Sequence, residues 1–201
     1  FWENRIARSF SFSNSFWHHF EKIGAPIHSG NDLWRHLNPL SPGLNRVEAD
    51  ELSYGLHIMI RTELEIDLLE KGLPVDELPS EWNRRYHTLL GVSPENDVEG
   101  CLQDVHWSEG MFGYFPSYLI GHLISGQLTH TLEKDLGPIE NIIESGQISI
   151  ILNWLRKNVH HYGRSINAEE LVKKVTGSTL SSRFFLEYLE KKVEKLSLIS
   201  D

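Results

Sequence analysis

The chain has 201 residues, of which 40% are hydrophobic, so it is long enough to bury a sizeable core and too apolar for a disordered protein. Its formal net charge of -9 argues against a nucleic-acid surface, because phosphate contacts need clustered Lys and Arg. No apolar run approaches the ~20 residues that cross a bilayer, and no basic start followed by an apolar middle marks a signal peptide. We therefore expect a soluble, cytoplasmic protein without membrane or nucleic-acid partners.

The first residues and the only cysteine refine this expectation. The chain opens on Phe1-Trp2-Glu3-Asn4, without Met and without a capping residue, as if a helix had been cut partway along. We therefore expect a piece of a longer protein. Cys101 has no second cysteine to pair with, which fits a reducing compartment. We predict a structural thiol, because His106 is the only nearby basic group that could activate it.

Apolar residues recur at helical spacing along the chain, with no hairpin signal and no sustained alternation. This pattern predicts an all-α protein with one helical unit over residues 1–201. In chain order, the predicted helices cover residues 1–22, with an irregular Ser-rich middle, then 31–37, 46–71, 76–90, 117–136, 138–145, 148–162, 167–175, and 181 or 182 onward. In the helix over 117–136, Gly121, Ser125 and Gly126 would allow a close approach by a neighbouring element.

The helix predicted over residues 46–71 has the strongest periodicity and ends at Gly72. His57 lies beside its apolar face, which predicts a hydrogen-bonded core histidine. Arg46 is poorly placed at a helix start, because the macrodipole there disfavours a positive charge. This position favours a specific anionic partner for Arg46, and an ion pair with Asp50, one turn further on, is an alternative role.

The stretch from Glu99 to Tyr118 is the strongest candidate for a site. It places an amide, a carboxylate and an imidazole (Gln103, Asp104 and His106) within four positions, among glycines and aromatic residues. An ordinary surface loop gains little from so many aromatic rings beside titratable groups. The alternative is an aromatic loop that plugs one end of a helical bundle.

Residue types alone do not supply a catalytic centre. The eleven histidines include no His-Glu-x-x-His segment and no pair separated by three residues. Asp104 and His106 are two candidate ligands, which is too few for a zinc site. A Gly-x-Ser-x-Gly elbow and a glycine-rich phosphate loop are also absent from the sequence.

Two segments carry a resemblance to a known family. Arg46-Val-Glu-Ala-Asp50 and Gly100-Cys-Leu-Gln-Asp-Val-His-Trp107 resemble the Arg-x-x-Ala-Asp and Gly-x-x-Gln-Asp-x-His-Trp motifs of the M32 metallocarboxypeptidases, the carboxypeptidase Taq type. Asn45 stands where that family usually has an aliphatic residue, a departure that concerns packing more than chemistry. The similarity extends to Trp2-Glu3-Asn4 and to residues 110–118.

The resemblance implies a zinc enzyme that releases single C-terminal amino acids from peptides with free C-terminal carboxylates. It also implies broad specificity with poor action on proline, and a homodimer. The family's zinc ligands and general-base Glu precede the segment that corresponds to Trp2-Glu3-Asn4. We therefore expect this chain to be the C-terminal part of such an enzyme, to bind no catalytic zinc alone and to be inactive alone. The alternative is a non-catalytic helical module that binds a peptide or a protein.

The resemblance also implies roles for individual residues. Arg46 would recognise the substrate carboxylate, because a guanidinium can make a bidentate, charge-assisted pair. Gln103 would hydrogen-bond the substrate backbone, and Asp104 would belong to the same substrate-binding group. Asp104 or a backbone carbonyl would also fix the tautomer of His106. His106 would stabilise the oxyanion or position the substrate, and Tyr114 would donate its hydroxyl to the same developing charge. We expect Tyr118 to be a packing residue.

Overall fold

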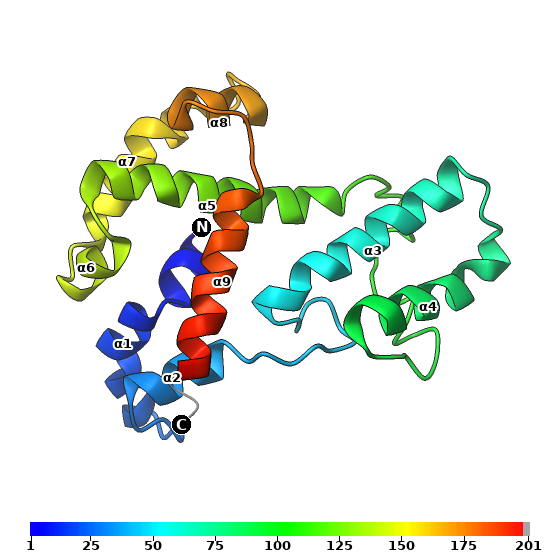
Figure 1. The fold of residues 1–201 in the computed structure, drawn as a ribbon, viewed down its shortest axis with the longest axis horizontal. Coiled ribbons are helices and arrows are strands. Elements are labelled where there is room, and N and C mark those ends of the chain that lie inside the picture. The colour runs from blue at the N-terminus through cyan, green and yellow to red at the C-terminus, as the bar shows by residue number, and fades with distance from the viewer. Residues whose placement is uncertain (199–201) are drawn as a thin grey trace. The chain divides into compact units, whose positions relative to one another are not determined.

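The protein is built from helices in the computed structural model, which describes residues 1–198 (Figure 1). No strand occurs in these residues, which confirms the all-α prediction. The elements are η1 (Trp2–Ala7), α1 (Phe10–Lys22), α2 (Gly30–Leu37), α3 (Glu51–Leu69), η2 (Val75–Glu77), α4 (Leu78–Leu90), α5 (Pro116–Leu136), α6 (Ile139–Glu144), α7 (Ile148–Asn158), η3 (His160–Tyr162), α8 (Ala168–Thr176) and α9 (Arg183–Leu198). None of these helices has the length and apolar run that crossing a membrane takes.

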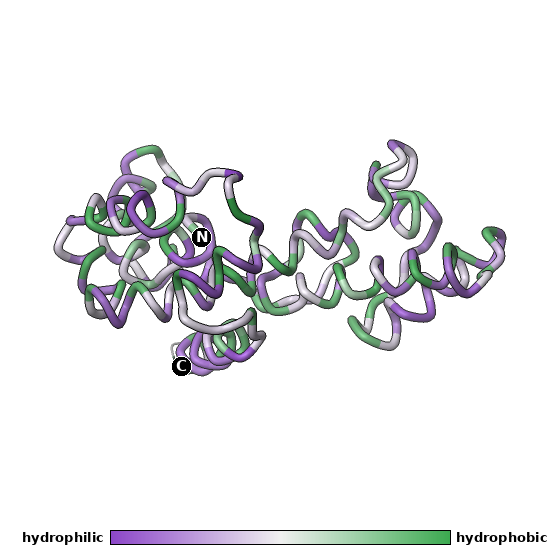
Figure 2. Tube along the Cα trace, turned by 90° about the horizontal axis from the view of Figure 1, so that it is seen from above, coloured by the Kyte–Doolittle hydropathy of each residue, from purple (hydrophilic) through white to green (hydrophobic). Residues whose placement is uncertain are grey.

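The elements form two compact units. Unit 1 consists of residues 1–38 and the described residues from 121 onward, and unit 2 consists of residues 39–120. Hydrophobic and hydrophilic positions alternate along the helices of each unit (Figure 2), as amphipathic helices with buried stripes require. The expectation of one helical unit over residues 1–201 stays a prediction for the chain as a whole.

Unit 1 has its core where α5, α6 and α7 meet. Leu132, Ile143 and Ile151 contribute to this core and are almost inaccessible to solvent. Gly126 on α5 allows α9 to come close, because a Cβ at this position would lie 3.1 Å from the backbone nitrogen of Phe185. The predicted close approach is therefore confirmed at Gly126.

The prediction of a close approach also includes Gly121 and Ser125 of α5. A Cβ at Gly121 would meet nothing within 4 Å, so the predicted close approach is wrong there. Ser125 is buried and accepts a hydrogen bond from Nε of Arg5 at 3.4 Å. Ser125 and Gly126, about one turn beyond Gly121, are therefore the residues of α5 that contact neighbouring elements.

Unit 2 is organised by α3 and α4, which lie side by side (Figure 1). Ile60 and Leu64 of α3 pack in one core cluster with Trp82 and Tyr86 of α4, all four at 1% exposure or less. Gly91 ends α4 in the left-handed conformation that glycine adopts without strain. Burial of these large side chains fixes the surface of α3 on which the candidate site is built.

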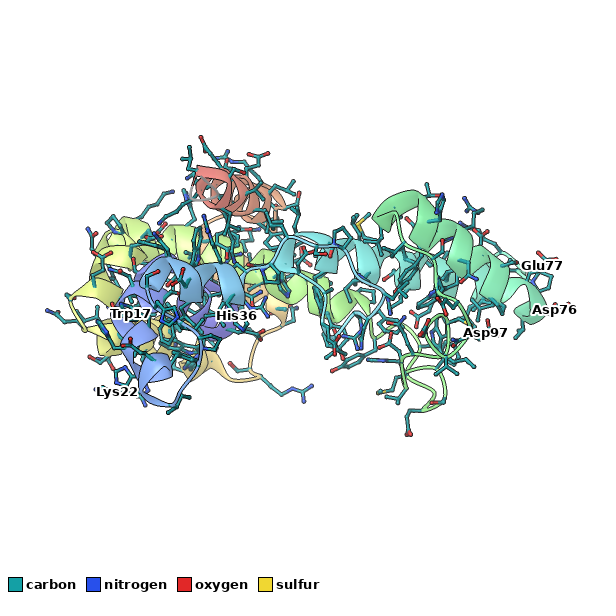
Figure 3. The ribbon with its side chains drawn as sticks, turned by 90° about the horizontal axis from the view of Figure 1, so that it is seen from below. Trp17, Lys22, His36, Asp76, Glu77 and Asp97 are labelled. Carbon is teal, nitrogen blue, oxygen red and sulfur yellow. The ribbon has the colours of Figure 1, made fainter. Side chains whose placement is uncertain are left out.

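Acidic side chains mark the outside of unit 2. Asp76 and Glu77 project outward from unit 2 in Figure 3, and both of them and Asp97 are exposed. They contribute to the negative net charge of the chain. Their exposure separates them from the buried polar groups described below.

Helix starts differ from the predictions where a side chain caps the helix earlier or later than expected. The predicted helix over 1–22 is interrupted at Ser9, which accepts a hydrogen bond from Phe12 N and starts α1 after the π-helix η1. Ser29 caps α2, so this helix starts at Gly30, one residue before the predicted range of 31–37. Asp50 caps α3, so the predicted start at Arg46 is wrong. A cap satisfies an otherwise unpaired helical N–H, which decides the boundary more strongly than apolar spacing does.

Two C-terminal predictions can also be compared with the structure. The helix predicted over 148–162 is wrong in its last four residues, because α7 ends at Asn158 and a 3-10 turn follows. The capping box at Asn167 and Glu170 is confirmed, since each side chain accepts a hydrogen bond from the backbone N–H of the other.

Candidate functional site

The candidate residues lie mainly in the segment between α4 and α5, which is built from turns. Gly100 N donates to Asn96 O at 3.0 Å and Gln103 N donates to Gly100 O at 3.1 Å, so the chain folds back just before the polar residues. Gly113 has φ +74°, a conformation that costs glycine little. The ring of Phe115 then closes the segment at 1% exposure. Local turns and one buried ring therefore fix this segment.

Asp104 is shared by two arginines. Its Oδ1 accepts hydrogen bonds from Nε and Nη2 of Arg46 at 2.9 and 2.7 Å, and its Oδ2 accepts one from Nε of Arg61 at 2.5 Å. Burial alone would raise the pKa of Asp104, but the hydrogen bonds and charges of the two guanidiniums hold that pKa below its ordinary value. Asp104 is therefore ionised at neutral pH, with both oxygens bound.

Arg46 lies before α3, in an irregular segment, and its side chain is largely buried. The alternative ion pair with Asp50 is wrong, because Arg46 pairs with Asp104 while the carboxylate of Asp50 accepts from Ser53 N. Tyr54 also hydrogen-bonds the Arg46 guanidinium, and the guanidinium carbon lies 5.1 Å from the ring centroid of Tyr118. Arg46 is thus held by a carboxylate, a hydroxyl and an aromatic ring.

Gln103 uses its whole side-chain amide within the protein. Its Oε1 accepts from Arg46 N at 3.1 Å and from Nη2 of Arg61 at 2.8 Å, and its Nε2 donates to the carbonyl oxygens of Leu44 and Glu99. Four bonds saturate an amide group. In this arrangement Gln103 ties together the two chain segments of the site, and its contact with substrate stays a prediction.

His106 is buried at 4% exposure, and its Nε2 lies 3.0 Å from the hydroxyl of Tyr118. Its Nδ1 has no hydrogen-bond partner and lies 3.7 Å from Oδ1 of Asp104. This distance is too long for a hydrogen bond, so neither Asp104 nor a backbone carbonyl fixes the tautomer in the predicted way. Burial lowers the pKa of His106, the charge of Asp104 opposes this effect, and the charges of Arg46 and Arg61 lower the pKa further. The net shift is downward, so the imidazole is neutral at pH 7.

The two tyrosines have different positions around His106. Tyr114 is 47% exposed, and its ring centroid lies 5.7 Å from that of His106. Tyr118, in the first turn of α5, was expected to be a packing residue. Its hydroxyl instead bonds His106, and its ring meets that of Tyr114 edge to face. Phe112 is 49% exposed, so the aromatic residues of this segment do not all fill an interior, as a plug would.

Two charged residues of the site were missed by the sequence analysis. Arg61 is fully buried, and Glu65, one turn further along α3, accepts hydrogen bonds from Nε1 of Trp107 at 2.8 Å and from Gly113 N at 3.0 Å. Both residues share the buried face of α3 with Leu64. Charged residues at core-facing spacing are rare unless they are paired, and this was the available signal.

Cys101 and His57 have the structural roles that the sequence predicted. Cys101 is buried in the unit 2 core, and burial raises the pKa of its thiol, which disfavours a reactive thiolate. His57 is inaccessible to solvent and its Nδ1 lies 3.0 Å from the Tyr86 hydroxyl. Burial lowers the pKa of His57 to about 4, and the charge of Arg61 adds to this effect.

The described residues do not fit a zinc ion. No group of three or more His, Cys, Asp or Glu side chains gathers within residues 1–198 in a way that could hold a metal.

Unit 1 contains a cavity of about 310 Å³ whose lining includes Phe10, Trp34, Tyr188 and Lys195. None of the candidate residues lines this cavity, since Arg46 and the loop over 103–114 belong to unit 2.

These observations place polar residues of both sequence motifs, Arg46 from the first and Gln103, Asp104 and His106 from the second, in one cluster. Comparison with known proteins identifies the family. The sequence profile of the Carboxypeptidase Taq (M32) metallopeptidases matches residues 1–193. The chain belongs to this family, which confirms the resemblance.

Individual relatives cover nearly the whole chain. The thermostable carboxypeptidase 1 of Thermus thermophilus is 40% identical over 97% of this chain and 39% of its own length. Carboxypeptidase 1 of Bacillus subtilis is 38% identical over 99% of this chain and 40% of its own length. The chain therefore spans about 40% of the length of these relatives.

Solved structures share the fold. The carboxypeptidase of Pyrococcus furiosus superposes with a TM-score of 0.91 at 33% identity, over 95% of this chain and 39% of that structure. An M32 carboxypeptidase from Deinococcus radiodurans gives a TM-score of 0.90 at 34% identity, over 97% of this chain and 40% of that structure. The all-helical arrangement is thus that of the M32 carboxypeptidases.

Proposed function

We propose that this chain is the C-terminal part of a metallocarboxypeptidase that releases single C-terminal amino acids from peptides. Family membership supports the class of reaction. The observation that carries the assignment of the site is the cluster of Arg46, Asp104, His106 and Tyr118, in which both family motifs meet. We further propose broad specificity with poor action on proline, a homodimer and a cytoplasmic location, as the family resemblance implies.

Arg46 is the proposed anchor for the free carboxylate of the substrate. A carboxypeptidase has to distinguish a terminal carboxylate from an internal peptide bond, and a guanidinium provides a charge-assisted, directional donor for this purpose. Two guanidiniums surround one carboxylate at Asp104, so the direct ion-pair cluster retains a positive charge. That residual charge favours an anionic ligand beside Arg46.

His106 and Tyr114 are the proposed groups for the oxyanion of the transition state. The imidazole is neutral, so it contributes an N–H dipole and not a full charge. Tyr114 has an exposed side chain beside the His106 ring, which leaves it accessible to a substrate. A donor aimed at a developing negative charge typically accelerates such a reaction ~10²-fold or more.

Zinc is the proposed metal of the complete protein, where it would polarise the scissile carbonyl as a Lewis acid. The described residues offer no ligand set for it, so we assign the ligands to the rest of the protein. The proposal accordingly includes that this chain is inactive alone and supplies the substrate anchor and part of the wall of the site.

The test uses the longest reading frame that contains this sequence, expressed with zinc and incubated with N-blocked peptides. We expect mass spectrometry to show stepwise loss of C-terminal residues from peptides with free carboxylates, and no loss from the matched C-terminal amides. The 201-residue chain should release none. Arg46→Lys should raise KM ~10-fold or more, because lysine lacks the planar fork.

The matched control is Arg84→Lys, because Arg84 is exposed and its ion pair is with Glu81, which lies on the same helix α4. Its kinetic constants should stay within ~2-fold of those of the wild type. Absence of C-terminal release by the zinc-loaded protein would contradict the proposed activity and would favour the non-catalytic peptide-binding module.

A further inference from the structure

Arg61 is a fully buried arginine in the middle of α3, and it makes hydrogen bonds with all three of its guanidinium nitrogens. Nε donates to Asp104 at 2.5 Å and Nη2 donates to Oε1 of Gln103 at 2.8 Å. Nη1 donates to the carbonyl of His57 and to the hydroxyl of Tyr86, each at 2.9 Å. Burial of a charge with this number of bonds costs much less than burial of an unpaired one.

Two of these bonds lead to Arg46 by separate routes. Through Asp104, Arg61 reaches the Arg46 side chain, because the other oxygen of the same carboxylate accepts from Nε and Nη2 of Arg46. Through Gln103, it reaches the Arg46 backbone, because the oxygen that accepts from Arg61 also accepts from Arg46 N. Both the position of Arg46 in the chain and the direction of its side chain therefore depend on partners that Arg61 holds.

Arg61 also changes the charge balance around Arg46. Asp104 facing Arg46 alone would form a neutral pair, whereas Asp104 shared with Arg61 leaves one positive charge in the cluster. The nearby carboxylate of Glu65 does not cancel this charge by direct contact, since it accepts from the neutral donors Trp107 Nε1 and Gly113 N. The Asp50 carboxylate is likewise bound to a neutral donor, because it caps α3 by accepting a hydrogen bond from Ser53 N.

We infer that Arg61 is a positioning residue that aims Arg46 at the terminal carboxylate of a peptide substrate and keeps the charge of Arg46 from being neutralised by Asp104. This inference rests on the proposed function. It assigns Arg61 no contact with substrate, because its side chain is inaccessible to solvent.

The test compares three variants of the complete, zinc-loaded protein: Arg61→Lys, Gln103→Met and Tyr86→Phe. Lysine keeps the charge but cannot hold Asp104 and Gln103 together. Tyr86→Phe is the matched control, because it removes a different partner of Arg61 and leaves both routes to Arg46 intact. Thermal unfolding shows that each variant is folded before its kinetic constants are compared.

We expect Arg61→Lys to raise KM for a peptide with a free C-terminal carboxylate ~10-fold or more, with kcat within ~3-fold of the wild type. The inhibition constant of the free amino acid product should rise by a similar factor. Tyr86→Phe should change KM, kcat and the inhibition constant by no more than ~2-fold. Equal effects of Arg61→Lys and Tyr86→Phe, or an unchanged KM in Arg61→Lys, would overturn the inference.

Gln103→Met decides the question if Arg61→Lys does not fold. It removes the backbone route together with the bonds of Nε2 to the carbonyls of Leu44 and Glu99, so the Arg46 guanidinium should be displaced in its crystal structure and KM should rise ~3-fold or more. An unchanged KM in this variant would count against the positioning role.

A crystal structure of the Arg61→Lys protein separates this inference from the proposed activity. We expect the Arg46 guanidinium to move from its wild-type position by ~1 Å or more, a displacement that is large for a binding site. If the wild-type protein releases no amino acid, the proposed function fails, and the position of Arg46 still tests Arg61. An unmoved Arg46 would refute the positioning role even in an active enzyme.

Discussion

The hydroxyl of Tyr118 lies 3.0 Å from Nε2 of the buried His106, so the two side chains form one hydrogen-bonded pair. Replacement of either residue leaves the other without this partner. In the complete protein, we predict that His106→Ala lowers kcat by ~10²-fold and Tyr118→Phe by ~10-fold. The double variant should be no slower than His106→Ala alone, because paired residues act as a unit.

Steady-state kinetics on the four proteins measure this coupling. Tyr162→Phe is the control for loss of a tyrosine hydroxyl, because Tyr162 belongs to unit 1 and the candidate residues belong to unit 2, and its kcat should equal that of the wild type. Effects of the two single variants that multiply in the double variant would show that the residues act independently. An unchanged kcat in His106→Ala would remove its proposed role at the oxyanion.

Gly126 and Gly121 form a matched pair for the packing of α5. A Cβ at Gly126 would meet the backbone of α9 at 3.1 Å, and a backbone cannot move aside as a flexible side chain can. We predict that Gly126→Ala lowers the free energy of unfolding by ~1–3 kcal/mol. Gly121→Ala should raise it by ~0.5–1 kcal/mol, since alanine favours helix and has open space there.

Urea denaturation of the 201-residue chain, followed by helical circular dichroism, measures both changes. A wild-type value for Gly126→Ala would mean that α9 can shift without cost.

His57 gives a pH dependence to the stability of unit 2. Its pKa is about 4 in the folded protein against an ordinary value of 6.5, so between these two values only the unfolded chain binds the proton. Its contribution to the free energy of unfolding is therefore complete above pH 6.5 and decreases by about 3 kcal/mol as the pH falls to 4. The free energy of unfolding of His57→Gln should decrease less between pH 7 and pH 4 than that of the wild type.

Denaturant titrations at several pH values test this prediction. His36→Gln is the control, because His36 is an exposed histidine of α2 in unit 1 (Figure 3). The slope of stability against pH should remain in this control. Identical slopes in the wild type and His57→Gln would contradict the prediction.

Asp104 gives the free energy of unfolding a second dependence on pH, in a more acidic range than that of His57. It arises from ion pairs with arginines, whereas that of His57 arises mainly from burial. Its two guanidinium partners lower its pKa in the folded protein, so the unfolded chain takes up a proton first as the pH falls. The stabilisation is complete above the unfolded pKa of about 4 and is lost as the pH falls through the folded value. Asp104→Asn should therefore be less stable than the wild type at pH 7 and lose less stability below pH 4.

The exposed Asp76 provides the comparison for this acid titration. Asp76→Asn should keep the wild-type loss of stability below pH 4 in denaturant titrations. A wild-type acid dependence in Asp104→Asn would show that the shared carboxylate does not control this part of the curve.

The helices could be predicted from sequence because their apolar spacing reflects burial against neighbours. Boundaries were less accurate where a single side chain decides them, as at Ser9 and Asp50, since apolar residues continue past the cap. Val47 illustrates this error: it is an apolar residue within the helix predicted over 46–71, but it lies in the segment before α3 and is 74% exposed.

The motifs located the site in sequence, whereas its contacts depend on tertiary structure. Arg61 was not identified because its partner Asp104 is 43 residues away in the chain, beyond any local pattern. Arg46 is 58 residues from the same partner, and Asp50, a nearby carboxylate on the same predicted helix, was the alternative that a local pattern offered. Helical spacing shows which face of α3 is buried, but not which loop covers that face.

One consequence concerns the motion of the loop that carries His106. Arg61 and Glu65 lie one turn apart on α3 and bind this loop on either side of His106, at Asp104 on one side and at Trp107 and Gly113 on the other. The loop and the central turns of α3 should therefore fluctuate as one rigid segment. The amide of Gly113, although it lies in a loop, should exchange its hydrogen as slowly as the amides of α3.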